Sequence, residues 1–152
     1  MNPDKEIRFL PFQAEDQAAV KALILAGLAG HWGTLDLSLN PDLNDIGRSY
    51  AGAYFLVAWQ GQTVVGTGAL VPLSADTAQI VRMSVAAGLR RKGIGGQILA
   101  RLCDHARLNG LQKIILETTA TWQDVIEFYQ THGFRITHYQ DGDAYFVLAL
   151  SA

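Results

Sequence analysis

Residues 85–96 read Val85-Ala86-Ala87-Gly88-Leu89-Arg90-Arg91-Lys92-Gly93-Ile94-Gly95-Gly96 and join a predicted strand to a predicted helix. Glycine lets a ligand approach the backbone without obstruction by a Cβ atom. The first N–H groups of a helix have no partner within it and lie at the positive end of its dipole. Three basic residues add full charges at the same place. The segment therefore predicts a site for a bound diphosphate. The alternative is a solvated basic turn whose glycines serve only close packing.

Two phosphate-binding motifs of other folds do not match this segment. The dinucleotide fingerprint G-x-G-x-x-G would need glycine at position 98, where Ile98 stands. A P-loop would need Gly-Lys-Ser/Thr, whereas Gly93 is followed by Ile94. The segment is therefore neither of these motifs.

The rest of the chain alternates between strand and helix patterns. Apolar and β-branched runs predict strands at 7–12, 54–59, 63–71, 77–85, 113–118, 134–139 and 144–150. Helical periodicity predicts helices at 15–29, from Ile94 to the stop at Asn109-Gly110, and at 122–131, and the turn at Asn40-Pro41-Asp42 opens a short helix through Tyr50. Strand–helix–strand units favour parallel pairing and hairpins favour antiparallel pairing. We expect one α/β domain with a mixed central sheet of about seven strands flanked by helices.

Three segments together carry a resemblance to a known family. Arg90 to Gly95 is similar to the pyrophosphate motif Gln/Arg-x-x-Gly-x-Gly/Ala of the GNAT family of N-acetyltransferases, and Gln79 to Val85 resembles that family's fourth strand. Downstream, Glu127-Phe128-Tyr129-Gln130-Thr131-His132-Gly133-Phe134 resembles its Phe-Tyr-x-x-x-Gly-Phe signature. Both motifs occur in the family's order across roughly residues 77 to 136.

The resemblance implies a binding site for acetyl-CoA in the splay between the fourth and fifth strands, at 79–85 and 113–118. Backbone groups of Met83 and Val85 would bond the pantetheine amides, and the N–H groups from Arg91 to Gly96 would hold the pyrophosphate. Trp122 stands where the family often has an asparagine, and an indole N–H can donate but not accept. The cofactor-binding residues expected on this basis are Met83, Ser84, Val85, Arg90, Arg91, Lys92, Gly93, Ile94, Gly95, Gly96 and Trp122.

The resemblance also implies direct transfer of an acetyl group to the primary amine of a small or amino-acid-like acceptor. Tyr129 stands at the position of the family's general acid, and a phenol with a pKa near ~10 is protonated at neutral pH. Gln79 stands where many members have a glutamate, and an amide cannot accept a proton. Glu117, at the end of the fifth predicted strand, is then the candidate base. The alternatives are a packing aromatic at 129 and a solvent-facing glutamate at 117.

His31 and Trp32 fall in the predicted loop after the first helix, where the family builds its acceptor pocket. They are expected to contact the substrate, and the alternative is local packing. The four histidines lack paired ligand spacing, so no metal is expected. The single cysteine, Cys103, lies beside an apolar helix stripe and is expected in the core.

Composition limits the classes of partner. The chain has 152 residues, a formal net charge of −2 and an isoelectric point of about 6.0. These values argue against a nucleic-acid binder or a basic membrane-surface protein. One cysteine excludes an intramolecular disulfide. The polar N-terminus predicts no signal peptide and a cytoplasmic location. Protein N-terminal acetylation and non-catalytic acyl-CoA binding stay open as alternatives, and no residue pattern decides between a monomer and a homodimer.

Overall fold

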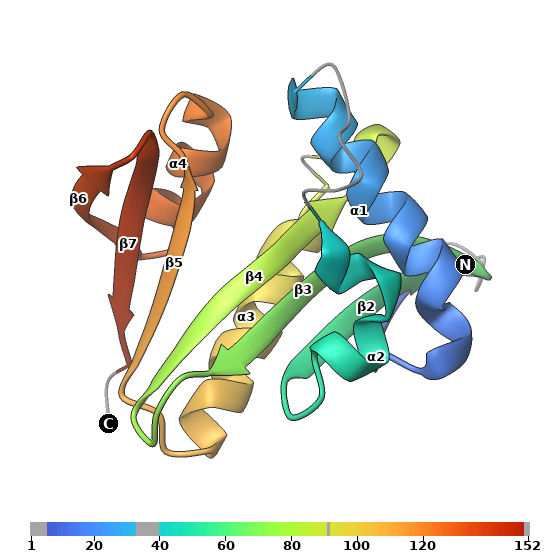
Figure 1. The fold of residues 1–152 in the computed structure, drawn as a ribbon, viewed down its shortest axis with the longest axis horizontal. Coiled ribbons are helices and arrows are strands. Elements are labelled where there is room, and N and C mark those ends of the chain that lie inside the picture. The colour runs from blue at the N-terminus through green and yellow to red at the C-terminus, as the bar shows by residue number, and fades with distance from the viewer. Residues whose placement is uncertain (1–5, 33–39, 91, 151–152) are drawn as a thin grey trace.

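The computed structural model describes residues 6–32, 40–90 and 92–150, and it leaves the side chains of His31 and Trp32 undescribed. These residues form a seven-stranded sheet in the order β1-β2-β3-β4-β5-β7-β6 (Figure 1). The strands are β1 (Ile7–Pro11), β2 (Tyr54–Gln60), β3 (Thr63–Pro72), β4 (Thr77–Val85), β5 (Lys113–Thr119), β6 (Arg135–Gln140) and β7 (Asp143–Ala149). The helices are α1 (Gln17–Trp32), α2 (Ile46–Ser49), α3 (Ile94–Leu108) and α4 (Gln123–Thr131). Short 3-10 turns occupy Ala14–Asp16, Pro41–Asn44 and Ala87–Leu89.

Strand pairing confirms the predicted mixed sheet. Among the described strands, β4 and β5 pair in parallel and every other neighbouring pair is antiparallel. The β6–β7 connection turns through two positive φ angles, at Asp141 and Gly142, as a tight hairpin requires. Two parallel neighbouring strands need a crossover connection, and helix α3 provides it between β4 and β5.

Several element boundaries differ from the predictions, three of them at residues of the predicted site or motifs. Helix α1 continues to Trp32, so His31 and Trp32 end a helix and do not lie in a loop. Trp122 is the N-cap of α4 and not its first turn. Gly133 has φ +94° and the N–H of Phe134 donates to the carbonyl of Tyr129, which delays the start of β6 to Arg135.

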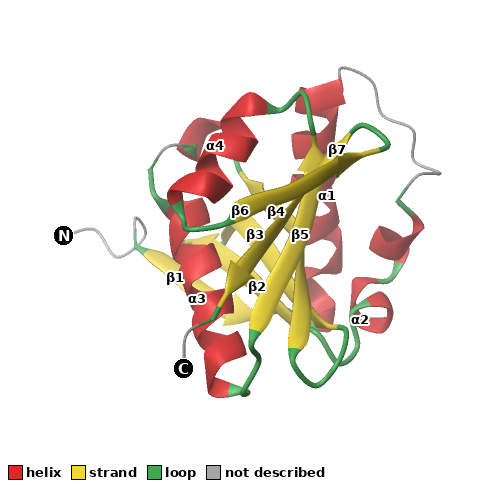
Figure 2. Ribbon diagram, turned by 90° about the vertical axis from the view of Figure 1, so that its left-hand side faces the viewer, coloured by secondary structure: helices red, strands yellow, loops and turns green. Residues whose placement is uncertain are grey.

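Helices cover the two faces of the sheet unequally. Figure 2 shows α1 and α2 on one face and α3 and α4 on the other. In β2 the consecutive residues Phe55 to Ala58 are all buried, because that strand has a helix layer on each face. Helix α1 lies over β3 and β4 and not over β5 to β7. One face of the C-terminal strands therefore has no helix over it in the described chain.

Helix α3 packs its apolar stripe on the sheet. Ile94, Ile98, Leu102 and Ala106 are buried on that stripe as predicted, and Cys103 is 6% exposed and belongs to the same core. A Cβ atom built on Gly66 of β3 would lie 2.8 Å from Ile98, so the close approach of α3 requires glycine there. No helix of the described residues is long and apolar enough to cross a membrane.

Candidate active site

The sheet opens between β4 and β5. Their pairing is confined to Thr77–Gln79 of β4 and Lys113–Ile115 of β5, and Figure 1 shows the two strands diverging beyond this point. A cavity of about 690 Å³ lies at the opening. Its lining comes from α1, β4, the segment that leads into α3, β5, α4 and the start of β7. It includes Gly27, Met83, Ser84, Val85, Arg90, Gly93, Gly95, Gly96, Glu117, Trp122, Phe128, Tyr129 and Asp143. Unpaired edges expose backbone donors and acceptors, so this cleft can bind an extended polar ligand.

A β-bulge shapes the β4 wall of the cleft. Arg82 has φ +56°, and the register with β3 shifts between Thr67 and Ala69. The hydroxyl of Thr67 donates to the carbonyl of Arg82 at 2.8 Å and so holds the bulge from the sheet side. A Cβ on Gly68 would lie 2.6 Å from the sulfur of Met83, so only glycine fits opposite the bulge. Bulges re-aim the strand beside active sites, and this one turns the Met83–Val85 backbone at the opening.

The Arg82 side chain ties the bulge to the segment before α2. Its guanidinium makes a two-point ion pair with Asp42, with Nη2–Oδ1 at 2.6 Å and Nε–Oδ2 at 3.0 Å. Nη2 also donates to Asn40 at 3.1 Å, and the Tyr50 hydroxyl donates to Asp42 at 2.6 Å. Paired geometry of this kind is the strong form of an arginine–carboxylate contact. The network fixes where residues 40–50 lie relative to the cleft.

Asp42→Asn is expected to lower the free energy of unfolding by about 1–3 kcal/mol near neutral pH, because Arg82 then loses its charged acceptor. Burial raises the pKa of Asp42, but hydrogen bonds from Arg82 and Tyr50 outweigh it and hold the pKa below its ordinary 3.8. A carboxylate with a lowered folded-state pKa stabilises the fold above its unfolded pKa, and this contribution is lost as pH falls through the folded value.

Urea unfolding of the wild type and Asp42→Asn at several pH values measures this difference, which should shrink below about pH 4. Asp104→Asn is the matched control, because Asp104 pairs with Arg107 at 3.2 Å on an exposed helix face. An exposed pair contributes roughly 0–1 kcal/mol. A deficit for Asp42→Asn that is the same at neutral and acid pH would contradict the assignment to this ion pair.

The N-terminus of α3 forms one end of the cleft. Gly93 is the N-cap with φ +84°, and the first helical bond runs from Gln97 N–H to its carbonyl at 3.0 Å. The N–H groups of 94–96 thus precede the first helical bond, which is the condition for an anion site. The exposed side chain of Arg90 lines the cleft beside them.

Not every basic or glycine position of the segment reaches the cleft. The Lys92 side chain is exposed and lies outside the lining, the Ile94 side chain is buried in the core, and Arg91 is outside the described residues. A Cβ on Gly96 would lie 2.9 Å from Nε2 of the exposed His132 side chain, so this glycine lies at the contact of α3 with α4. Gly95 differs, because its Cβ would meet Phe128 and Val85, which themselves line the cleft, at 3.4–3.5 Å.

Tyr129 of α4 lies on the cleft wall and is only 6% exposed. Its ring packs against those of Phe128, Phe134 and Phe146, with ring centroids 5.1–5.7 Å apart. Burial raises the pKa of the Tyr129 hydroxyl above its ordinary value of 10. The phenol is therefore protonated at any physiological pH and is held by its ring.

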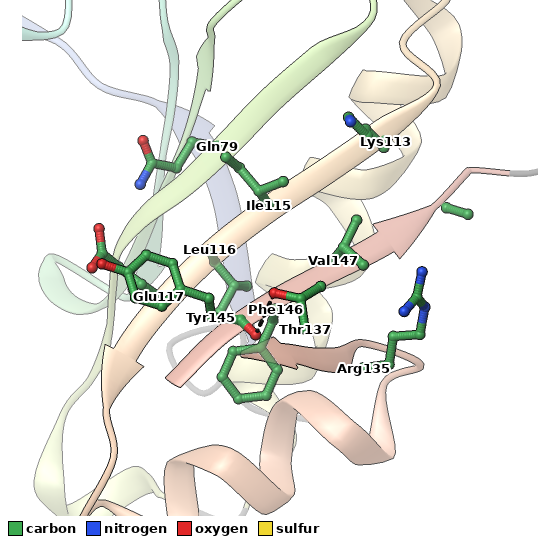
Figure 3. Close-up of a pocket in the computed structure, with 11 residues that line it drawn as sticks. Gln79, Lys113, Ile115, Leu116, Glu117, Arg135, Thr137, Tyr145, Phe146 and Val147 are labelled. Atoms are coloured by element: carbon green, nitrogen blue, oxygen red, sulfur yellow. Dashed lines mark hydrogen bonds between the residues drawn. The ribbon is translucent and has the colours of Figure 1, made fainter. Parts of the chain in front are cut away.

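Glu117 of β5 also lines the cleft and is paired in register with Tyr145 of β7. Figure 3 shows the Tyr145 hydroxyl pointing toward the Glu117 carboxylate. Desolvation and the neighbouring carboxyl of Asp143 raise the pKa of Glu117 above 4.5, and the hydrogen bond from Tyr145 partly opposes them. A stacked contact with His138, 4.5 Å between ring centroids, holds the Tyr145 ring. A carboxylate with a raised pKa suits a proton acceptor near neutral pH.

The structure brings part of the predicted site residues together in the cleft. Eight of the expected cofactor residues line the cleft with Tyr129 and Glu117, whereas the side chains of His31 and Trp32 fall outside the described part of the structure. Sequence reasoning missed Tyr145, Asp143 and the α1 contact at Gly27. The Gly27 contact had a signal in the sequence, because a glycine inside a predicted helix indicates close approach of another segment. A Cβ atom on Gly27 would lie 2.9 Å from Ser84 Oγ.

An opening between parallel strands, with a glycine-rich helix N-terminus at one end and ionisable side chains at the other, defines an α/β protein with a cleft for an anionic, extended ligand. The profile of the acetyltransferase (GNAT) family matches residues 19–134, more than half of the chain. The chain belongs to this family, and the predicted resemblance is confirmed.

Two relatives illustrate the sequence similarity. The chain is 36% identical over 106 residues to "Probable N-acetyltransferase family 8 member 5" of Mus musculus, covering 65% of this chain and 47% of that protein. It is 35% identical over 105 residues to "N-acetylaspartate synthetase" of Danio rerio, covering 66% and 37%. The chain thus spans about half the length, or less, of these relatives.

Two crystal structures share the fold. A GNAT-family acetyltransferase from Staphylococcus aureus Mu50 superposes with a TM-score of 0.87 at 22% identity, covering 96% of this chain and all of that one (100%). The paia N-acetyltransferase from Thermoplasma acidophilum, solved in complex with coenzyme A, gives 0.84 at 18% identity over 95% and 99%. At these identities the likeness shows the fold, which confirms the expected mixed sheet flanked by helices.

Proposed function

We propose that this protein is an acetyl-CoA-dependent N-acetyltransferase that acts on the primary amine of a small or amino-acid-like acceptor. The observation that carries the proposal is the single cleft that has the α3 N-terminus at one end and Tyr129 and Glu117 at the reactive end. Membership of the family supports it, and so does the coenzyme A bound to the similar Thermoplasma acidophilum enzyme.

The cleft residues fit acetyl-CoA, which supplies an activated thioester when bound. The N–H groups of 94–96 and the Arg90 guanidinium offer donors to a diphosphate. The unpaired β4 edge at Met83–Val85 offers backbone donors and acceptors to amide groups. Trp122 lines the same cleft and adds an aromatic surface there. The charge, the polarity and the extended shape of these groups match those of the cofactor.

The ionisable residues supply the proton transfers. An alkylammonium loses two protons when it becomes an amide: the N–C bond forms, the C–S bond breaks, and the sulfur gains one proton. Glu117 Oε accepts a proton from the amine and passes it to solvent. The Tyr129 hydroxyl donates the proton that the sulfur needs and recovers one as the product nitrogen gives up its second. The net products are the amide, a thiol and one proton in solution.

Gly95→Val is expected to abolish cofactor binding. The extra methyl groups would occupy the cleft between Phe128 and Val85. A ligand at a hundredfold excess over its Kd stabilises a protein by about 2.7 kcal/mol, so coenzyme A should raise the melting temperature of the wild type and not of the variant. Gly95→Ala is the matched control and should keep the shift, because the family motif admits alanine there. A wild-type protein that shows no shift at millimolar coenzyme A would refute the cofactor assignment.

A thiol-release assay with acetyl-CoA tests the acceptor class. The panel contains small primary amines, amino acids and peptides with free N-termini. Transfer to small amines in preference to peptides is the expected result. Preference for peptides would support N-terminal protein acetylation, and binding of acetyl-CoA without transfer to any of them would support a non-catalytic binding protein.

A further inference from the structure

A second cavity lies on the face of β5, β7 and β6 that no described helix covers. Its volume is about 490 Å³. Figure 3 shows it as a groove with Ile115 and Val147 in its middle. Thr137 lies on the β6 side, and its hydroxyl donates to the carbonyl of Tyr145 at 3.2 Å, which fixes this wall. The groove is open to solvent along its length and has a short apolar floor.

The groove and the cofactor cleft share one lining residue, Glu117. The cleft reaches Glu117 at the opening between β4 and β5, and the groove reaches it along the uncovered face. An amine in the groove can therefore place its nitrogen at the proposed base, with the cleft next to it. Gln79, at the last paired position of β4, lies at the same end of the groove and offers an amide to the amine.

Two cationic side chains line the groove away from Glu117. Lys113 of β5 lies in the farthest row, and Arg135 of β6 lies in the row of Ile115 and Val147. Both are exposed, and neither forms an ion pair within the part of the chain that the structure describes. Hydrogen bonds from Thr77 and Ser74, and then the charge of Lys113, lower the pKa of Asp76. Lys113 thus also interacts with Asp76, whereas Arg135 forms no ion pair among the described residues.

Strand register sets the spacing between the two ends. Glu117 is paired with Tyr145, Arg135 with Val147, and Lys113 with Ala149, so the cations lie one and two side-chain rows away from the base on the same face. The Cα atoms of Lys113 and Glu117 are about 13 Å apart at the usual rise of a strand. The flexible Lys113 side chain shortens this span, and the row of Ile115, Val147 and Arg135 lies between the two ends.

We propose that this groove binds the acceptor, and that the acceptor is an amine with a carboxylate at the other end of a short alkyl chain. The amine lies at Glu117, the chain lies on Ile115 and Val147, and the carboxylate pairs with Arg135 and Lys113. An arginine fork suits a carboxylate in two-point geometry. This assignment rests on the proposed acetyl transfer, and it adds Arg135 as a specificity-determining residue.

Calorimetric titration of the protein–coenzyme A complex tests the proposal without turnover. The probes are ω-amino carboxylates of increasing chain length and the alkylamines of the same lengths. The ω-amino carboxylates are expected to bind at least about tenfold more tightly than their matched alkylamines, with an optimum at intermediate length. Equal affinity within each pair, or no binding of any ω-amino carboxylate, would overturn the proposal.

Variants then locate the contact. Arg135→Ala is expected to remove about tenfold of the preference for the carboxylate, and Lys113→Ala a smaller part, with alkylamine binding unchanged. Arg107→Ala is the matched control, an exposed arginine on α3 away from the groove. If the preference for ω-amino carboxylates survives when Arg135→Ala and Lys113→Ala are combined, the proposal is overturned.

A thiol-release assay on the same compounds separates this proposal from the proposed function. Transfer to alkylamines and ω-amino carboxylates at equal kcat/KM contradicts the groove assignment and leaves the acetyltransferase intact. Selective binding of the carboxylates with no transfer supports the groove and contradicts the enzyme.

Discussion

Tyr129→Phe is expected to lower the turnover number by about 10²–10⁴-fold, the usual effect of removing a general acid. The variant loses only the hydroxyl of a residue that lines the cleft. Without it the leaving sulfur must take its proton from water. The raised pKa of Tyr129 keeps the hydroxyl protonated at neutral pH, so a proton is available for the sulfur.

The ring of Tyr129 explains why folding should change little. Its contacts with Phe128, Phe134 and Phe146 involve the ring and not the oxygen, and phenylalanine keeps them. The midpoint of urea unfolding and the thermal shift with coenzyme A should therefore match the wild type. These two measurements separate a chemical role from a packing role.

Steady-state kinetics with a saturating acceptor gives the result. Tyr54→Phe is the control, because Tyr54 lies on β2 and stacks on His105, at 3.9 Å between ring centroids, away from the cleft. Tyr54→Phe should retain the wild-type rate. Turnover of Tyr129→Phe within a few-fold of wild type would show that Tyr129 is a packing aromatic, the alternative raised by the sequence.

Much of the fold follows from local patterns that tertiary contacts do not oppose. The strand at 77–85 is predicted with the bounds it has, since apolar and β-branched residues fill it and a turn precedes it. The α3 stripe is predicted because the four residues spaced at i+4 all face the sheet. The prediction fails at ends such as Trp32 and Phe134, where one turn of helix or one positive φ decides the boundary.

The site is harder to predict because its geometry depends on residues far apart in sequence. An arginine in the left-handed region has no local signature, and the bulge at Arg82 depends on Gly68 opposite and on Asp42, forty positions earlier. Tyr145 becomes a partner of Glu117 only through the register of β5 and β7. The groove likewise needs the register of three strands, whereas Tyr129 and the α3 N-terminus lie within contiguous motifs.

Glu117→Gln is expected to reduce kcat/KM by about 10²-fold or more near neutral pH, because the amine then loses the proposed proton acceptor at position 117. The substitution is nearly isosteric at an exposed strand position, so fold and cofactor binding should persist. Only the small neutral fraction of the amine can react in the variant. The deficit should shrink above the pKa of the acceptor, where the amine is already neutral.

The pH–rate profile of the wild type should report the raised pKa of Glu117. Its kcat/KM should rise with pH as Glu117 loses its proton, at a pH above the ordinary 4.5. Asp143→Asn removes a neighbour that raises this pKa, so the acidic limb should move to lower pH. Tyr145→Phe removes a hydrogen bond that lowers it, so the limb should move to higher pH.

Opposite shifts of the acidic limb in these two variants would identify Glu117 as the titrating group. A purely structural role of the Glu117 side chain would leave the acidic limb unmoved in both variants. Gln79→Glu is the companion variant, because it restores a carboxylate at the position where many family members have one. Combined with Glu117→Gln, it should recover part of the lost rate if a carboxylate at either edge of the opening can take the proton. A Glu117→Gln deficit that is absent, or equal at every pH, would assign the base to a water-relayed group elsewhere and leave Glu117 a structural role.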